Sequence, residues 1–289
     1  MTHTISSAYH GNSSRAIVPV DGKCLRGSYD RNQGIKALQL VTAWAAQHCL
    51  TLGQIKVEDH SNEITAIAAL LELIDVTGAI VTIDAMGTQT EIVRLIRTKK
   101  ADYVLALKSN HPTLHSQVKN WFDAASANNF EGITVSHDRR VEKGHHRREK
   151  RRVWAVPLSE FAGLYQQEQW LGLQSIVMVE RTRHLWNKVT YEVQFYLSSL
   201  PADAHVLGNA IRTHWGIENQ VHWTLDVTFN EDKSRIRSGH APRNYAFLRR
   251  MALNALNLEK TLKRSLRQKS RRASMNNDYM MTVLKCFCQ

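Results

Sequence analysis

The chain has 289 residues, 43% of them hydrophobic, which is enough for one large domain or two small ones with a buried core. No apolar run approaches the ~18 residues of a membrane span, and the N-terminal segment lacks the charged-then-apolar pattern of a signal peptide. The four cysteines are too scattered for a disulfide framework or a paired Cys-x-x-Cys zinc site, so we expect a protein of the reducing cytoplasm.

The net charge of +12 is concentrated in short stretches of the chain. Residues 233–272 hold 13 Lys and Arg and one acid, Glu259, a balance that equals the excess of the whole chain. A second block, Arg139–Arg152, has eight bases and two acids. Basic blocks on a neutral body predict contact with a polyanion, and a solvated basic face or an acidic membrane surface are the alternatives. Because aromatic residues do not interleave the blocks, phosphate contacts are favoured over single-strand stacking.

Three candidate strands lie in the first part of the chain. Ala16–Val20 is predicted to be a short strand that runs into Asp21, and Pro19 is awkward there because it has no N–H for a sheet ladder. Leu38–Ala46 and Cys49–Glu58 are β-like runs with a very short connection, which predicts a hairpin.

A strand–helix–strand pattern follows. Ser61 is predicted to cap a helix that extends to about Ile74. The apolar runs Ala79–Ile83 and Tyr103–Leu107, with a helix between them, predict a parallel βαβ unit. They end at Asp84 and Lys108, and ligand chemistry in open α/β sheets gathers beyond the carboxyl ends of strands. For each of these residues alone, a helix cap or a turn is an equal alternative.

The second half of the chain begins with a helical pattern over residues 115–127. From about Gly132 to Ser199 the pattern becomes β-like, which predicts an inserted β region that contains the block Arg139–Arg152. Amphipathic spacing predicts a helix over Tyr245–Leu258, and a last short helix is expected over Tyr279–Phe287.

A helical stripe near the end of this part contains one carboxylate. Ile211, Trp215, Glu218, His222 and Leu225 fall on one face at the spacing of a buried helix stripe. A buried Glu is costly unless it is paired, protonated or bound to a cation. Glu218 therefore either meets a base or points into a site, and the alternative is an ordinary helix whose Glu218 reaches solvent past Trp215.

The motifs for nucleotide cradles, nucleophile elbows and zinc proteases are absent. His214 and His222 are eight residues apart, which is a poor helical spacing for two zinc ligands. Three carboxylates remain, namely Asp21, Asp84 and Glu218. Hard divalent cations prefer oxygen ligands, and two ions ~3.5–4 Å apart can clamp the attacking and leaving oxygens of a displacement at phosphorus.

Several segments carry a family resemblance. They are VDGKCLRGSYD, VEDHSNEITAIAALLELIDVTGAIVTIDAMG, YVLALKSNHPTL, EKGHHRREKRRVW, IRTHWGIENQVHWTLDVTFNEDKSRIR and the closing Arg-rich helix. In this order, over residues 16–289, they resemble the H-repeat-associated transposases, which are DDE transposases of bacterial insertion sequences. The resemblance implies an α/β fold with a ribonuclease H-like mixed sheet flanked by helices and a β-rich insertion before the last catalytic helix.

The resemblance also implies the chemistry. The catalytic and metal-binding residues would be Asp21, Asp84 and Glu218, which would bind two Mg²⁺ or Mn²⁺ ions for the cleavage and joining of DNA at element ends. The broader superfamily surrounds the Glu with a Tyr, Arg and Lys signature, which this chain does not carry. We expect the following residues to contact DNA or to support the metal ligands: Lys23, Lys108, Asn110, His145, Arg147, Arg148, Asn219, His222, Arg235 and Arg237.

The expected organisation has five parts. These are a disordered tail (1–15), the first part of the core (16–127), the β-rich insertion (128–200), the Glu218 helix (201–232) and a basic helical region (233–289). The expected partner is double-stranded DNA, bound by a homodimer in the bacterial nucleoid. Relatives begin with a further helical region, so an inactive truncated copy that only binds DNA remains an alternative, as does a ribonuclease H-like nuclease.

Overall fold

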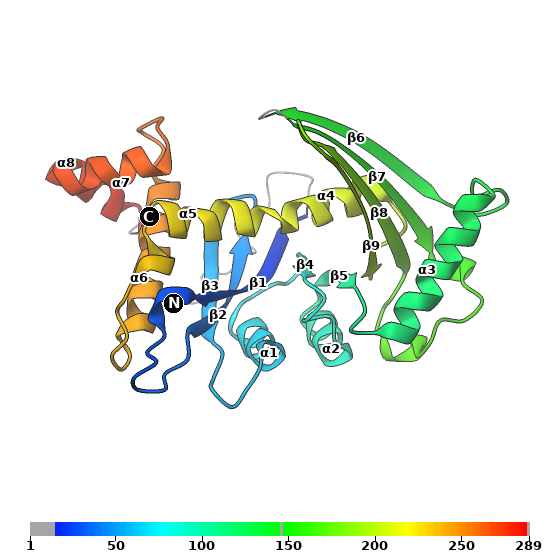
Figure 1. The fold of residues 1–289 in the computed structure, drawn as a ribbon, viewed down its shortest axis with the longest axis horizontal. Coiled ribbons are helices and arrows are strands. Elements are labelled where there is room, and N and C mark those ends of the chain that lie inside the picture. The colour runs from blue at the N-terminus through cyan, green and yellow to red at the C-terminus, as the bar shows by residue number, and fades with distance from the viewer. Residues whose placement is uncertain (1–14, 145–146, 288–289) are drawn as a thin grey trace. The chain divides into compact units, whose positions relative to one another are not determined.

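The structure, a computed structural model, describes residues 15–144 and 147–287 and divides into two compact units (Figure 1). The first unit contains residues 75–214 and the short segment 15–17, and the second contains Val18–Ile74 and residues 215–287. Residues 1–14, expected to be disordered, lie outside the described residues, whereas Arg15 belongs to the first unit and pairs with Asp102 at 2.6 Å. In the described part of the chain, no helix is long and apolar enough to cross a membrane.

The predicted strand–helix–strand pattern of the first unit is confirmed. Strands β4 (Ile80–Ile83) and β5 (Asp102–Leu107) are parallel, and α2 (Thr90–Thr98) connects them. All four residues of β4 are buried, as a continuous apolar run predicts for a parallel strand. Helix α3 (Pro112–Ala127) follows β5 and begins three residues earlier than expected, with a proline in its first turn.

The β-rich insertion is an antiparallel sheet of long strands. They are β6 (Ser136–Gly144), β7 (Arg147–Pro157), β8 (Ser175–His184) and β9 (Val189–Ser198), and β9 also pairs with β5. The sequence pattern does not predict β6, because this strand is almost entirely polar. Helix α4 (Ala204–His214) packs on the sheet through Leu207 and Ala210, which contact Val153 and Ala155 of β7 among other buried side chains.

The second unit contains the predicted hairpin as part of a three-stranded antiparallel sheet. Its strands are β1 (Ile17–Leu25), β2 (Leu38–Ala45) and β3 (Leu50–Lys56). β1 extends well past the predicted end at Val20, so Asp21 lies in the middle of a strand and not at its end. Pro19 is tolerated because the pairing of β1 with β2 begins one residue later, at Val20↔Ala43. Helix α1 (Glu63–Leu73) is capped by Asn62, whose side chain accepts from the Thr65 N–H, and not by Ser61.

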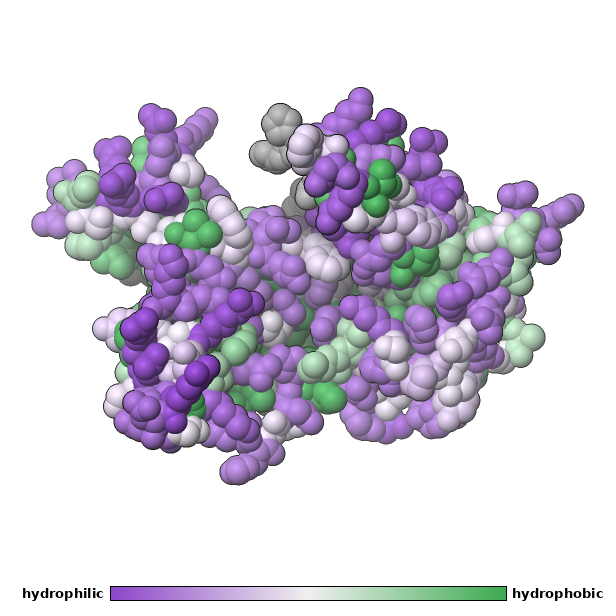
Figure 2. Space-filling view, viewed as in Figure 1, coloured by the Kyte–Doolittle hydropathy of each residue, from purple (hydrophilic) through white to green (hydrophobic). Residues whose placement is uncertain are grey.

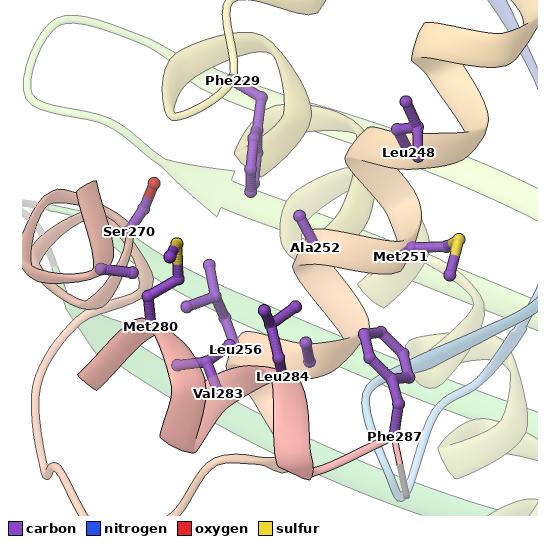
Figure 3. Close-up of a pocket in the computed structure, with 12 residues that line it drawn as sticks. Phe229, Leu248, Met251, Ala252, Leu256, Ser270, Met280, Val283, Leu284 and Phe287 are labelled. Carbon is purple, nitrogen blue, oxygen red and sulfur yellow. The ribbon is translucent and has the colours of Figure 1, made fainter. Parts of the chain in front are cut away.

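Helical elements complete the second unit. They are a π-helical turn at Ile217–His222 that continues into α5 (Trp223–Val227), a 3-10 turn at Glu231–Lys233, and the helices α6 (Ala241–Leu258), α7 (Leu266–Met275) and α8 (Asn277–Lys285). The pattern does not predict α7, since its sequence is rich in Arg and Lys and has no apolar stripe. Helices α6, α7 and α8 line an apolar groove with a volume of about 300 Å³, which Figure 3 shows with Met251, Met280 and Leu284 at its walls.

The expected fold class is confirmed. The strand order is β3-β2-β1 in the second unit and β4-β5-β9-β8-β7-β6 in the first, with antiparallel and parallel pairs in a mixed sheet. An antiparallel meander, then a parallel crossover, then a β-rich insertion before the Glu218 helix is the element sequence of a ribonuclease H-like α/β fold with one large insertion.

Candidate active site

Asp84 follows β4 directly, at the carboxyl end of a buried parallel strand of the first unit. Its Oδ1 accepts hydrogen bonds from the backbone N–H groups of Met86 and Gly87, at 3.1 and 3.3 Å. Among the described residues, its Oδ2 has no hydrogen-bond donor, and the side chain is only half-buried. The backbone therefore holds one carboxylate oxygen and leaves the other available to a ligand.

The loop after β5 fastens the loop that carries Asp84. The Asn110 side-chain amide donates to the carbonyl of Ala85 at 2.6 Å, and His111 Nε2 lies 2.6 Å from the carbonyl of Thr88. The Thr88 hydroxyl in turn donates to the carbonyl of Ala106 at 2.7 Å. Asn110 thus stabilises the backbone of the Asp84 loop. The sequence did not indicate the roles of Thr88 and His111. Both lie beside the predicted residues, and neither has a sequence signal of its own.

His214 is a second residue near Asp84 that the sequence reasoning did not place. Its Nδ1 lies 3.0 Å from the hydroxyl of Thr82, which is buried in β4. Removal of the ring from water lowers the pKa of His214 to about 4, against the opposing effect of the Asp84 charge. The imidazole is therefore neutral at pH 7. The uncharged ring of His214 joins α4 to β4.

In the second unit, the Glu218 helix packs on β2 through one side. Ile217, Val221 and Leu225 are buried and form a cluster with Trp44 of β2, whereas Glu218 is exposed. Ile211, His222 and Leu225 of the expected stripe are buried, and Glu218 reaches solvent, which is the alternative that the sequence left open. A π-helical turn spans Ile217–His222.

Gly216 permits the close approach of this helix to β2. A Cβ at this position would lie 2.8 Å from a ring carbon of Trp44, which is 1% exposed and cannot move aside. π-helical turns occur frequently at functional sites. Here the turn places the row Glu218, His222 and Asp226 next to the row that packs on Trp44.

This row meets β1. His222 Nδ1 lies 3.5 Å from Asp21 Oδ2, and Lys23 Nζ lies 2.8 and 2.7 Å from the two carboxylate oxygens of Asp226. Asp21 and Lys23 are two residues apart on one strand, so their side chains share a face. His222 and Asp226 are four residues apart and share a row of the helix. The structure thus brings together Asp21, Lys23 and His222 of the predicted set.

Asp226 and Asp232 are functional candidates that the sequence reasoning missed. Lys23 is 8% exposed, and Asp232 adds a second carboxylate 3.5 Å from its ammonium group. The neighbouring Glu231 is buried and pairs with Arg250 of α6 at 2.8 Å. The signal was available, because a lysine on a buried strand requires acidic partners.

Glu218 lies one turn before His222 and points to solvent. Its carboxylate makes no hydrogen bond or ion pair within residues 15–144 and 147–287. The side chain of Asn219 donates to the carbonyl of Trp215 at 2.9 Å, within its own helix. The uncommitted oxygens of Asp84 and Glu218 are the hard ligands that Mg²⁺ prefers, so their chemistry fits a divalent ion. The described residues contain no ready-made cluster of three or more metal-ligating side chains.

The remaining predicted DNA contacts are distributed over both units. Lys108, Arg148 and Arg235 are exposed. Arg237 donates to the carbonyl of Gly27 at 3.3 Å and lies over the ring of Tyr29, so part of its role is structural. His145 lies outside the described residues, and Arg147 opens β7.

The family model described as "Transposase DDE domain" matches residues 12–255. The Escherichia coli K12 protein YbfL is 36% identical over 95% of this chain and 73% of its own length. The "H repeat-associated putative transposase YhhI" of the same strain is 36% identical with the same coverage. Among solved structures, a piggyBac transposase synaptic complex with hairpin DNA matches with 10% identity and a TM-score of 0.47, over 93% of this chain and 54% of that one.

Proposed function

Because the chain belongs to the transposase DDE domain family, we propose that it is a transposase that cleaves DNA at insertion-sequence ends and joins the ends to target DNA. The observation that carries the proposal lies in the second unit, where the helix row of Glu218, His222 and Asp226 meets Asp21 and Lys23 of β1. Asp84, held at the end of β4, supplies the third carboxylate.

In this proposal Asp21, Asp84 and Glu218 hold two Mg²⁺ or Mn²⁺ ions, which when bound activate water, and later a 3′-hydroxyl, for attack at phosphorus. The other residues orient these ligands. His222 fixes the carboxylate of Asp21, while the backbone N–H groups of Met86 and Gly87 fix that of Asp84. Lys23 holds β1 against the helix of Glu218 through its ion pair with Asp226.

The proposed partner is double-stranded DNA in the bacterial nucleoid, bound by a homodimer. Lys108, Arg148 and Arg235 are exposed bases that suit contacts to the phosphate backbone. Arg250 and Lys269 are buried, 2% and 7% exposed, and are assigned to structure although they belong to the basic stretch 233–272.

A substrate panel tests the proposal. Labelled duplexes that carry the flanking element ends, random duplexes and RNA–DNA hybrids are incubated with Mg²⁺, with Mn²⁺ and with EDTA. We expect metal-dependent nicking confined to the element ends. Cleavage of the hybrid alone would assign a ribonuclease H-like nuclease, and salt-sensitive binding without nicking would assign a DNA-binding remnant; either result contradicts the proposal.

A further inference from the structure

Strand geometry divides the basic block Arg139–Arg152 between two faces of the β6–β9 sheet. Successive side chains of a strand point to opposite faces, and β6, β7, β8 and β9 pair in continuous register, so residues in register share a face. One face, here called the α4 face, packs on α4 through Val153. The other, here called the outer face, carries Phe195, which stacks on Phe122 of α3. The bases of the outer face are Arg139, Lys143, Arg148, Lys150 and Arg152.

The bases of the α4 face are used within the protein. Each of the following bases has an acidic partner on that face: Arg151 and Arg183 with Glu149, Arg181 with Glu192, and Arg140 with Asp138. Arg212 of α4 pairs with Glu142 of β6 at 3.2 Å. The α4 face is therefore close to neutral, and its arginines hold strands and helix together.

On the outer face, most of the bases have no acidic partner among the described residues. Over the described residues of β6–β9, the acid on this face is Glu180, and it pairs with Arg152. Arg139, Lys143, Arg148 and Lys150 make no ion pair with any described residue, and Arg139, Lys143 and Arg148 are exposed. Four positive charges thus stand on one sheet face with no acid to balance them.

On the outer face, basic side chains of β6 lie directly opposite basic side chains of β7, which is unfavourable when no ligand is bound. Lys143 lies directly opposite Arg148, and Arg139 lies directly opposite Arg152. Like charges directly opposite each other across two strands destabilise the pair. Arg152 is paired with Glu180, so the repulsion that a bound polyanion would remove is that between Lys143 and Arg148.

Two exposed side chains with apolar surface lie on the same face. Val141 of β6 lies between Arg139 and Lys143 and is 40% exposed, and Tyr191 of β9, two strands away from Lys150, is 62% exposed. In Figure 2, the upper right part of the view, where β6–β9 end in Figure 1, is mainly hydrophilic with scattered hydrophobic residues. Such a mixture suits a partner that offers sugars and base methyl groups beside its phosphates.

The basic side chains of β7 form a row on this face. Arg148 and Lys150 are two residues apart along the strand, which is about 6.6–6.8 Å. A row of unpaired cations suits a duplex, since each of its strands carries one negative charge per about 3.4 Å of the helix axis. We propose that the outer face of β6–β9 binds the phosphate backbone of duplex DNA, and that the bases of the α4 face do not. This inference rests on the proposed function and names the surface through which the first unit would hold its DNA.

The test compares three full-length variants in EDTA, so that cleavage plays no part. The outer-face variant carries Lys143→Gln, Arg148→Gln and Lys150→Gln. A control with equal charge carries Arg94→Gln, Lys99→Gln and Lys100→Gln, at the end of α2 and outside both basic blocks. A third variant, Arg183→Gln, removes a base of the α4 face. Duplex binding is measured by fluorescence anisotropy from about 50 to 200 mM salt, and folding by thermal unfolding.

We expect the outer-face variant to bind DNA at least tenfold more weakly at low salt. Its slope of log K against log salt should fall by about 2–3, because each lost phosphate contact removes about 0.9. Its melting temperature should not fall, since a like-charge pair is removed. The α2 control and Arg183→Gln should keep the wild-type slope, and Arg183→Gln should melt earlier.

The inference is overturned if the outer-face variant keeps the wild-type affinity and salt slope. It is also overturned if the α2 control loses as much duplex affinity as the outer-face variant. Metal-dependent nicking by the wild type, together with unchanged binding by the outer-face variant, would reject this surface alone and leave the proposed function standing. A wild-type protein that neither binds nor nicks a duplex would reject both.

Discussion

At the scale of single residues, Lys23 connects β1 to the helix of Glu218. Its side chain is 8% exposed, and its ammonium group lies near the carboxylates of Asp226 and Asp232, which are themselves only partly buried. We predict that Lys23→Met lowers the free energy of unfolding by about 1–3 kcal/mol, because two neighbouring carboxylates lose their shared cation. Urea unfolding measures the effect. Lys23→Arg, which keeps the charge, should lose less, and a Met variant as stable as wild type would rule out this role.

Glu259 is the acid of the basic stretch 233–272, and it holds the C-terminal helices together. It is 1% exposed and accepts from the hydroxyls of Thr261 and Tyr279, the backbone N–H of Leu262 and the ammonium group of Lys269. Burial alone would raise its pKa, but these donors outweigh burial and lower the pKa of Glu259 to about 2.

The lowered pKa predicts a pH dependence of stability. A carboxylate whose folded pKa lies below its unfolded value stabilises the protein above the unfolded value, and this stabilisation disappears as the pH falls through the folded pKa. For Glu259 the window runs from 4.5 down to about 2. Wild type should exceed Glu259→Gln by on the order of 3 kcal/mol at pH 7, and the difference should shrink across that window.

Urea unfolding at several pH values measures this difference. Glu168→Gln, at an exposed position, serves as the control and should change stability little at any pH. A difference between wild type and Glu259→Gln that stays constant from pH 7 to pH 2 would contradict the assigned network.

At the scale of elements, the π-helical turn depends on Gly216. We predict that Gly216→Ala destabilises the second unit by about 1–3 kcal/mol, because its Cβ would overlap the buried ring of Trp44. The displaced helix should also separate His222 from Asp21 and lower any strand cleavage. Gly144→Ala is a matched control, since a Cβ there meets nothing within 4 Å. Equal stability of the two variants would show that the helix does not need this close approach.

Helices and strands whose apolar residues recur at a regular spacing were predictable from the sequence. The hairpin β2–β3, the βαβ unit and α6 follow directly from apolar runs and spacing, because each has a regular pattern of apolar residues along its own sequence. β6 and α7 were not predictable, since ion pairs and a capping box stabilise them in place of an apolar face. The π-helical turn was also not predicted, whereas the exposure of Glu218 was one of the alternatives that the sequence left open.

At the scale of the whole molecule, net charge was an incomplete guide to the proposed DNA-binding surface. The excess of +12 includes bases that are buried or paired, such as Lys269, Arg250 and the arginines of the α4 face. Sequence alone cannot separate these from exposed bases, because alternation along a strand and the partners of each side chain arise only on folding. Likewise the three carboxylates were found through the resemblance, and their supporting residues Asp226, His214 and His111 through the fold.

Asp84 is the proposed ligand for catalytic metal ions at the end of β4. Asp84→Asn tests this proposal sharply, because an amide oxygen can still accept from the Met86 and Gly87 N–H groups while the charge is lost. Asp75→Asn is the matched control, since Asp75 accepts in the same way from the Thr77 N–H. The assay is Mg²⁺-dependent nicking of a labelled duplex that carries the element ends, with duplex affinity measured in parallel.

We predict that Asp84→Asn lowers nicking by at least about a hundredfold, as expected when several kcal/mol of metal-dependent stabilisation is lost. Its duplex affinity should stay at the wild-type level, and Asp75→Asn should nick normally. Nicking by Asp84→Asn at the wild-type rate would contradict the claim and remove Asp84 from the site.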